Sequence, residues 1–311
     1  MVTVNFYGVE RSRQGIAAIQ LRQTPGGEGV YRNCRFGFGN PNADWQVVGT
    51  WDLNDFLNDA QFRIPGKKAI YLQQEPPEVC WHPPDRLREF TAILTPSVLD
   101  VDGPKQFIAP PCLGWMYGLR IELQPGLGHW FDPQGIVPFD HLLTAQPPAK
   151  TRLCSMIVSQ KTFTPGHRKR VEFLTRLRDH CKNRIDFFGF GYNPILDKKE
   201  AIDPYLFSIA VENSVHRNYW TEKIADIYLG HAMPIYHGAP NIDDFFASAS
   251  LQRIDIEQTD ATIAAIETLL DHPERHNPQL LAQERSNLLE KYNFFNYIAL
   301  AIENTIHPPR P

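Results

Sequence analysis

The stretch LFSIAVENSVHRNYWTEKIADIYLGHAMPIYHG, residues 206–238, contains a short apolar run, a helix-like segment and a second apolar run. The apolar runs at 206–214 and 232–238 read as strands, and the segment between them reads as a helix. Short continuous apolar strands that alternate with helices are typical of parallel βαβ units. The stretch therefore predicts an α/β fold built on a parallel sheet.

The same alternation extends upstream. Residues 153–160 read as a buried strand, 167–183 as a helix, and 184–191 as a strand that ends in glycines. Before them, TAQPPAK at 144–150 has no periodicity and two adjacent prolines. Prolines in a segment without periodicity mark a break between elements, so we interpret this segment as a linker.

The two ends of the chain have different patterns. Residues 1–148 are rich in Pro and Gly, and their strand candidates are hard to order. These candidates lie at 2–8, 45–51, 68–72 and 90–96. Residues 279–304 read as one long helix with an apolar side. The polar face of this predicted helix carries glutamates, whereas helices that lie on a membrane surface usually carry Lys and Arg there. Packing against the domains is therefore the favoured interpretation. We expect domains at 1–148 and 149–290, followed by a C-terminal helix and tail at 291–311.

Composition excludes several classes of protein. The 311 residues are 42% apolar and carry a net charge of −4. Disorder is disfavoured, because disordered chains contain few apolar residues. Broad nucleic-acid binding is disfavoured as well, because proteins of that class usually carry an excess of basic residues. No apolar run approaches the roughly 18 residues of a membrane span, and the start does not read as a signal peptide. Five cysteines without CxxC spacing indicate neither a disulfide framework nor a zinc site, so a reduced cytosolic protein is expected.

Polar residues gather where the strand at 206–214 ends. In open parallel sheets ligands bind at the carboxyl ends of the strands, so Asn213 should lie at a binding edge. Helical spacing places Tyr219, Glu222 and Lys223 on one side of the following helix. A lysine is unfavourable at a helix N-terminus, which attracts anions, and a bound phosphate would resolve that conflict. The competing interpretation is a solvated first turn capped by Asn218 or Thr221.

A second basic cluster follows the strand at 153–160. Lys161, Arg168, Lys169 and Arg170 surround the start of the next helix. A strand end and a helix start meet here as well, so a guanidinium from this cluster could reach the same sheet edge. A run of basic residues is more often a solvated face, and alone the cluster is a weak signal.

Together these residues carry a family resemblance over roughly residues 150–245. Glu212-Asn213-Ser214, Tyr219-Trp220-Thr221-Glu222-Lys223 and Pro234-Ile235-Tyr236-His237-Gly238 resemble the signature of the α1,3/α1,4-fucosyltransferases. Upstream, Arg170 with Phe173 and Leu177, and Asp186 with Gly189, fit the same family. Trp220 and Asn218 depart from its usual pattern, and the first 148 residues barely match it.

The resemblance implies a fold of GT-B type with two facing Rossmann-like domains and a C-terminal helix packing back across them. The first domain would bind the acceptor and the second would bind the donor, GDP-fucose. Arg170 and Lys223 would hold the pyrophosphate, and Asn213, Tyr219 and Glu222 would line the nucleotide and the fucose. The family holds donor phosphates without a mandatory protein-bound metal, so no cofactor is expected.

The family also inverts the anomeric centre and uses a glutamate of the first domain as the base. The segment AIYLQQEPPE at 69–78 offers Glu75, with Glu78 as a rival. A carboxylate just past an apolar strand is placed to take a proton from an acceptor hydroxyl. The acceptor is left open, because it is selected by the half of the chain that barely matches.

Two other functions remain open at this point. Asp100 and Asp102 have the DxD spacing of metal-dependent sugar transferases, although the same residues also read as a turn. A glycan- or nucleotide-binding protein without catalysis is the second alternative. Because no membrane anchor is recognised, the chain resembles the soluble bacterial branch of the family. We therefore expect a cytoplasmic enzyme, either free or peripheral at the inner membrane face, that decorates lipopolysaccharide or another surface polysaccharide.

Overall fold

The computed structural model describes residues 1–8, 20–63, 67–124, 128–131, 135–158, 165–181, 183–189 and 191–306. The chain divides into two compact units. Unit 1 comprises 1–114, 136–143 and 289–311, and unit 2 comprises 115–135 and 144–288. These units differ from the expected ranges, because the hairpin of β8 (Ile121–Gln124) and β9 (Gly128–Phe131) belongs to unit 2 and the C-terminal helix belongs to unit 1.

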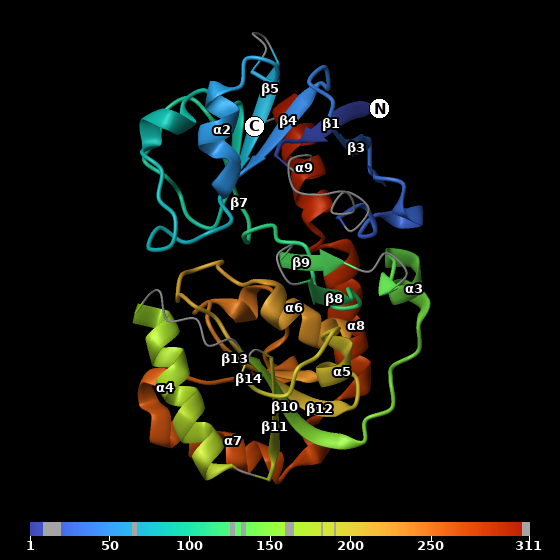
Figure 1. The fold of residues 1–311 in the computed structure, drawn as a ribbon, viewed down its shortest axis with the longest axis vertical. Helices are drawn as coiled ribbons and strands as arrows, with labels where there is room; N and C mark the ends of the chain where they lie inside the picture. Colours follow the sequence, from blue (N-terminus) through green and yellow to red (C-terminus); the bar gives the residue numbers. More distant parts are fainter. Residues whose placement is uncertain are drawn as a thin grey trace. The chain divides into compact units, whose positions relative to one another are not determined.

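Unit 1 is built on a sheet with the strand order β2-β3-β1-β4-β5-β6-β7 (Figure 1). All its pairings are parallel except that of β2 with β3. The strands are β1 (Val2–Phe6), β2 (Val30–Tyr31), β3 (Cys34–Phe38), β4 (Trp45–Gly49), β5 (Lys68–Leu72), β6 (Ala92–Thr95) and β7 (Lys105–Ile108). The four predicted strands of this half are confirmed as β1, β4, β5 and β6. The sequence did not predict β2, β3 and β7.

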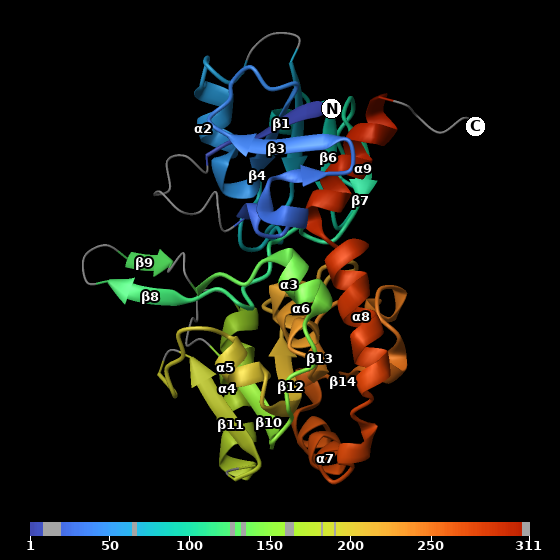
Figure 2. The same cartoon turned by 90° about the vertical axis from the view of Figure 1, so that its right-hand side faces the viewer.

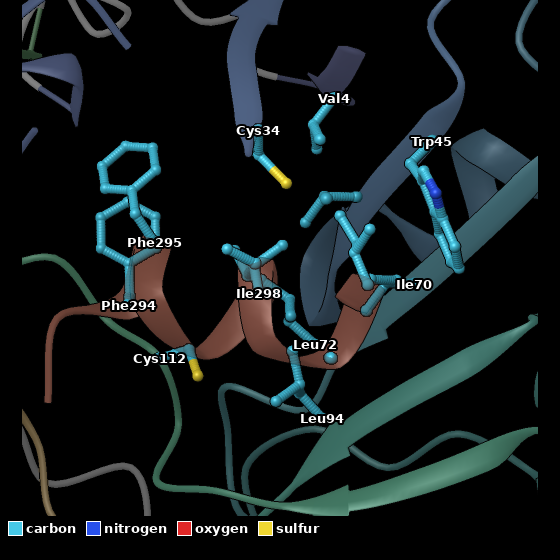
Figure 3. Packing of buried hydrophobic residues seen from close by; sticks show 14 of the residues in the cluster. Val4, Cys34, Trp45, Ile70, Leu72, Leu94, Cys112, Phe294, Phe295 and Ile298 are labelled. Carbon is cyan, nitrogen blue, oxygen red and sulfur yellow. The ribbon is translucent and has the colours of Figure 1, made fainter. Parts of the chain in front are cut away.

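Apolar cores cover both faces of this sheet, as a parallel sheet requires. The helices α2 (Leu53–Asn58) and α9 (Phe294–Ile306) lie on opposite faces (Figure 2). On the α9 face, Phe295 and Ile298 pack against strand residues that include Val4 and Ile70 (Figure 3). On the α2 face, the core contains Phe56 among other residues. The last helix of the chain therefore completes the core of the first unit.

Unit 2 is built on a fully parallel sheet with the order β11-β10-β12-β13-β14. The strands are β10 (Arg152–Val158), β11 (Ile185–Gly189), β12 (Tyr205–Val211), β13 (Met233–His237) and β14 (Gln252–Arg253). The helices between and after them are α4 (Pro165–His180), α5 (Lys199–Ile202), α6 (Glu222–Leu229), α7 (Thr259–Leu270) and α8 (Pro278–Glu290). Figure 1 shows helices packed around this sheet. The predicted parallel α/β pattern is confirmed for this half, including the strand–helix–strand order of 206–238.

The predicted single helix at 279–304 is wrong. The structure has α8 and α9, separated at residues 291–293. Asn293 explains the break, because its side chain accepts a hydrogen bond from the Phe295 N–H at 3.0 Å and so begins a new helix. Its amide also donates to the Gln23 and Leu289 carbonyl oxygens, which fixes the turn between the helices. In the part of the chain that the structure describes, no helix is both long and apolar enough to cross a membrane.

Truncating a side chain of α9 that is buried in the core should lower the stability of unit 1. Phe295 is fully buried and its ring contacts those of Phe6, Phe36 and Phe294. We expect Phe295→Ala to lower the free energy of unfolding by about 3–5 kcal/mol, as measured by urea denaturation. The control Val98→Ala alters a side chain that is 76% exposed and should change it by less than about 0.5 kcal/mol. Equal effects of the two changes would show that α9 is not part of the unit 1 core.

Candidate functional site

The carboxyl end of β12 positions the first group of predicted residues. The Glu212 N–H donates to the His237 carbonyl oxygen at 2.9 Å, so strand pairing continues to the last residue before Asn213. The chain then turns away from the sheet and reaches α6. Asn213 is half-buried at this edge, where a parallel sheet binds its ligands.

Arg170 reaches the same edge from α4. Its Nη1 donates a hydrogen bond to Oδ1 of Asn213, although 43 residues separate the two in sequence. The Arg170 side chain is buried, and burial lowers its pKa while the nearby Glu212 carboxylate acts in the opposite direction. A buried guanidinium at a strand end is a preorganised site for an anion.

The other basic residues of that cluster lie elsewhere. Arg168 and Lys169 are exposed, and Lys169 forms an ion pair with Glu257 at 2.5 Å. Lys161 lies outside the described residues. Within the described part of the cluster, the interpretation as a solvated face therefore holds for Arg168 and Lys169, and Arg170 is the member that turns inward.

A buried carboxylate, which the sequence analysis assigned to no role, organises the start of α6. Both oxygens of Glu212 are bonded, and its side chain has no exposed surface. Oε1 accepts from the Thr221 N–H at 2.8 Å and from Thr221 Oγ1 at 2.9 Å, while Oε2 accepts from Lys223 Nζ at 3.0 Å. A buried charge needs such partners, because it has lost the solvation of water.

Glu212 also explains why a lysine is tolerated in the first turn of α6. We expected a bound phosphate to offset this unfavourable position, and in the structure the carboxylate already does so. Burial alone would lower the pKa of Lys223, but the carboxylates of Glu212 and Glu222 outweigh burial and raise it. Two N–H groups of its ammonium contact Glu212 and Thr221 at 3.0 Å, and Glu222 Oε1 lies farther away, at 3.7 Å.

The helix itself begins at Glu222, with Thr221 as its N-cap. Thr221 Oγ1 accepts a hydrogen bond from the Lys223 N–H at 3.3 Å, so of the two N-caps offered by the competing interpretation, Asn218 and Thr221, the structure has Thr221. Tyr219 precedes the helix, and helical spacing therefore does not describe its position. It is 4% exposed, and its ring lies 6.4 Å from that of His216.

One further ion pair ties α6 to the rest of unit 2. Lys198 Nζ lies 2.5 Å from Oδ2 of Asp226, whose side chain is 1% exposed. Oδ1 of Asp226 accepts from the backbone N–H groups of Met116 and Tyr117 at 2.8 and 2.9 Å. Because Asp226 and Lys198 are separated by 28 residues, sequence spacing gave no sign of this pair.

Glu222 lies between two ammonium groups. Burial alone would raise its pKa, but the charges of Lys223 and Lys198 outweigh burial and lower it to about 2. Glu222 is therefore a carboxylate throughout the physiological range. It can accept hydrogen bonds, and it cannot act as an acid near neutral pH.

In unit 1, Glu75 follows β5 and is half-buried, whereas its rival Glu78 is exposed. Trp51 Nε1 donates to Oε1 of Glu75 at 3.4 Å. A second carboxylate, Asp52, was missed by the sequence analysis. It lies against Gly49 at the end of β4, because a Cβ added to Gly49 would come within 3.5 Å of Asp52 Oδ2.

The remaining candidates show no convergent site. Asp100 and Asp102 are both exposed in the turn between β6 and β7. Over the described ranges, no three His, Cys, Asp or Glu side chains gather as metal ligands. His237 ends β13, and its Nδ1 lies 3.3 Å from the Ile254 carbonyl oxygen. Burial lowers the pKa of His237, which favours a neutral ring with a structural role.

Comparison with known proteins finds a family match that lies within unit 2. Residues 147–278 match the family described as glycosyltransferase family 10 (fucosyltransferase), C-terminal. The alpha-(1,3)-fucosyltransferase FucT of Helicobacter pylori is 31% identical over 110 residues, which cover 35% of this chain and 23% of that protein. The human 3-galactosyl-N-acetylglucosaminide 4-alpha-L-fucosyltransferase FUT3 is 28% identical over 197 residues, covering 59% of this chain and 44% of that protein. The chain thus spans less than half the length of these relatives.

Structural comparison extends the likeness to both units. A crystal structure of an alpha1,3-fucosyltransferase with GDP-fucose matches with a TM-score of 0.56 and 18% identity. The match covers 100% of this chain and 91% of that one. The α/β fold of GT-B type is thereby confirmed, with a mainly parallel sheet in unit 1 and a fully parallel sheet in unit 2.

Removing the buried carboxylate should destabilise unit 2. Glu212→Ala leaves Lys223 and Thr221 without their acceptor, and we expect a loss of about 3–5 kcal/mol in the free energy of unfolding, measured with urea. Glu257→Ala is the control, because its pair with Lys169 is more than half exposed and should cost no more than about 1 kcal/mol. A loss no larger than the control's would refute the organising role of Glu212.

Glu222 should make stability depend on pH in the acid range. Its pKa is about 2 in the folded chain against 4.5 for the unperturbed group, so its contribution is complete above pH 4.5 and is lost as the pH falls toward 2. We expect the melting temperature of Glu222→Gln to fall less steeply with pH in that window. Above pH 4.5 the free energies of unfolding of the variant and the wild type should differ by at most about 3 kcal/mol. Parallel curves for the variant and the wild type would contradict the lowered pKa.

Proposed function

We propose that the chain, whose residues 147–278 match glycosyltransferase family 10 (fucosyltransferase), transfers L-fucose from GDP-fucose to a glycan hydroxyl. The observation that carries the proposal is the cluster of Arg170, Asn213, Glu212 and Lys223 at the carboxyl end of β12, inside the matched segment. It is a preorganised cationic site at the edge where parallel sheets bind ligands.

The geometry of Lys223 supports binding of the donor pyrophosphate. An ammonium has three N–H donors, and the two short contacts go to Glu212 and Thr221. The third N–H has the distant Glu222 oxygen at 3.7 Å, which a phosphate oxygen can replace. In this proposal Arg170 and Lys223 bind the pyrophosphate. Contacts with the nucleotide and the fucose come from Asn213, Tyr219 and Glu222.

The proposed reaction is a single displacement with inversion. The acceptor hydroxyl oxygen bonds to C1 of fucose while the bond from C1 to the phosphate oxygen breaks, and GDP leaves with both electrons of that bond. Glu75 takes the hydroxyl proton. Cations at the pyrophosphate stabilise the charge that develops on GDP, so a protein-bound metal is not required in this proposal.

The acceptor and its setting are also part of the proposal. Another relative, FUT5 of Hylobates lar, carries the name 4-galactosyl-N-acetylglucosaminide 3-alpha-L-fucosyltransferase, and disaccharides of that 4-galactosyl class are the first acceptors to try for an α1,3 linkage. The resemblance to the bacterial branch favours a cytoplasmic enzyme that acts on lipopolysaccharide or another surface polysaccharide, either free or bound peripherally at the inner membrane face.

Donor binding is tested by thermal shift. GDP-fucose at 100 times its dissociation constant should stabilise the fold by about 2.7 kcal/mol, whereas UDP-galactose should not. A melting temperature raised more by UDP-galactose would reject the donor assignment. Transfer that disappears on chelation and returns with Mn²⁺ would favour a metal-dependent transferase that uses Asp100 and Asp102.

The base is tested by paired substitutions. Glu75→Gln should reduce the turnover number for transfer by about 10²–10⁴-fold and keep the thermal shift with GDP-fucose, because the amide cannot accept the proton. The control is Glu78→Gln, which changes the exposed rival and should keep transfer. Full activity of Glu75→Gln, or a selective loss in Glu78→Gln, would overturn the assignment of Glu75.

A further inference from the structure

We propose that Trp51 and Trp81 form a stacking surface for a pyranose ring of the acceptor glycan, beside Glu75. This inference rests on the proposed function, since it names the residues of unit 1 that would hold the acceptor.

The exposure of these two side chains is unusual. Trp51 is 64% exposed and Trp81 is 62% exposed. Tryptophan is highly buried on average, because its large apolar surface is costly to leave in water. The other tryptophans whose burial the structure describes, Trp45, Trp115 and Trp220, are at most 5% exposed. Two exposed indoles in one unit therefore call for an explanation by function.

The backbone neighbours of the two tryptophans are in direct contact. Thr50 precedes Trp51 and His82 follows Trp81, and His82 Nε2 lies 2.8 Å from the Thr50 carbonyl oxygen. The loop that follows β4 and the loop that follows β5 are thus joined at this point. The two indoles, which are 30 residues apart in sequence, start from one small region of the surface.

Glu75 belongs to the same region. The Gln74 N–H donates to Thr50 Oγ1 at 2.8 Å, which holds the segment before Glu75 against the β4 loop. Trp51 Nε1 then donates to Glu75 Oε1 at 3.4 Å. An indole whose N–H is engaged by a carboxylate has a restricted orientation, and it sets the distance between its ring face and that carboxylate.

The chemistry of such a surface suits a sugar. One face of a hexopyranose carries C–H groups with a slight positive charge, and the face of an indole is negative, so the two attract each other while both release water. The hydroxyl groups project from the rim of the sugar ring, and Glu75 lies beside the indole as an acceptor for one of them. The occupant is therefore a neutral pyranose, and a nucleotide phosphate is disfavoured beside a carboxylate.

The test measures glycan binding without any transfer. Labelled wild type is applied with GDP to an array of mammalian and bacterial glycans, together with Trp51→Ala, Trp81→Ala and the control Val98→Ala. We expect the wild type and the control to bind a common set of glycans, and we expect each tryptophan variant to lose at least ten-fold in affinity for that set. Trp51→Phe should keep more of the affinity than Trp51→Ala, because it retains an aromatic face.

The outcomes separate this inference from the proposed function. Unchanged glycan binding by both alanine variants would overturn the stacking surface, and so would the absence of glycan binding by the wild type. Thermal stabilisation by GDP-fucose is measured on the same preparations, and it should be equal in all of them. A failure of that stabilisation in the wild type would reject the donor assignment, whereas glycan binding that depends on the tryptophans would still support the surface.

Discussion

The buried carboxylate of Glu212 is the group on which the candidate site of unit 2 depends. Its backbone N–H pairs with β13 at the end of β12, and its two carboxylate oxygens accept four hydrogen bonds from Thr221, the N-cap of α6, and from Lys223 in the first turn. A charge without solvent exposure is stable only while these partners remain in place. The end of β12, the Thr221 cap and the Lys223 ammonium therefore stabilise one another. Displacing any one of them leaves a buried polar or charged group without its partner.

This arrangement fixes cations at the sheet edge through contacts with neighbouring carboxylates. Lys223 is neutralised from the buried side by Glu212, and farther along the helix Asp226 pairs with Lys198. The side chains of the site are thus held in place by contacts within the protein. Preorganisation of this kind strengthens electrostatic stabilisation, since the charges need not be reoriented during the reaction.

The elements that could be predicted from the sequence are those whose signal is local. The strands at 153–160, 184–191 and 206–214 are continuous apolar runs, and the structure contains β10, β11 and β12 there. The strands β3, CRFGF, and β7, KQFI, mix polar residues or glycine into their runs and lack such a signal. The apolar side of 279–304 continued past Asn293, so periodicity alone could not show that this side chain begins a new helix.

The candidate site divides in the same way. Motif spacing located Asn213, Glu222 and Lys223, because they lie within a dozen residues of one another. The partners Lys198 and Glu212, and the pairing of Arg170 with Asn213, depend on which side chains turn inward after the chain has folded. Burial of a charge is a property of the tertiary structure, and no pattern in the polar sequence between 206 and 238 distinguishes Glu212 from a solvated glutamate.

The position of α9 has a consequence for how the chain is made. A protein leaves the ribosome from its N-terminus, and domains generally fold as they emerge. The sheet of unit 1 emerges first, yet the residues that cover one of its faces, Phe295 and Ile298 among them, emerge after the whole of unit 2. During synthesis one apolar face of the unit 1 sheet therefore stays uncovered until α9 has emerged. The unit that is synthesised first is the one whose core is completed last.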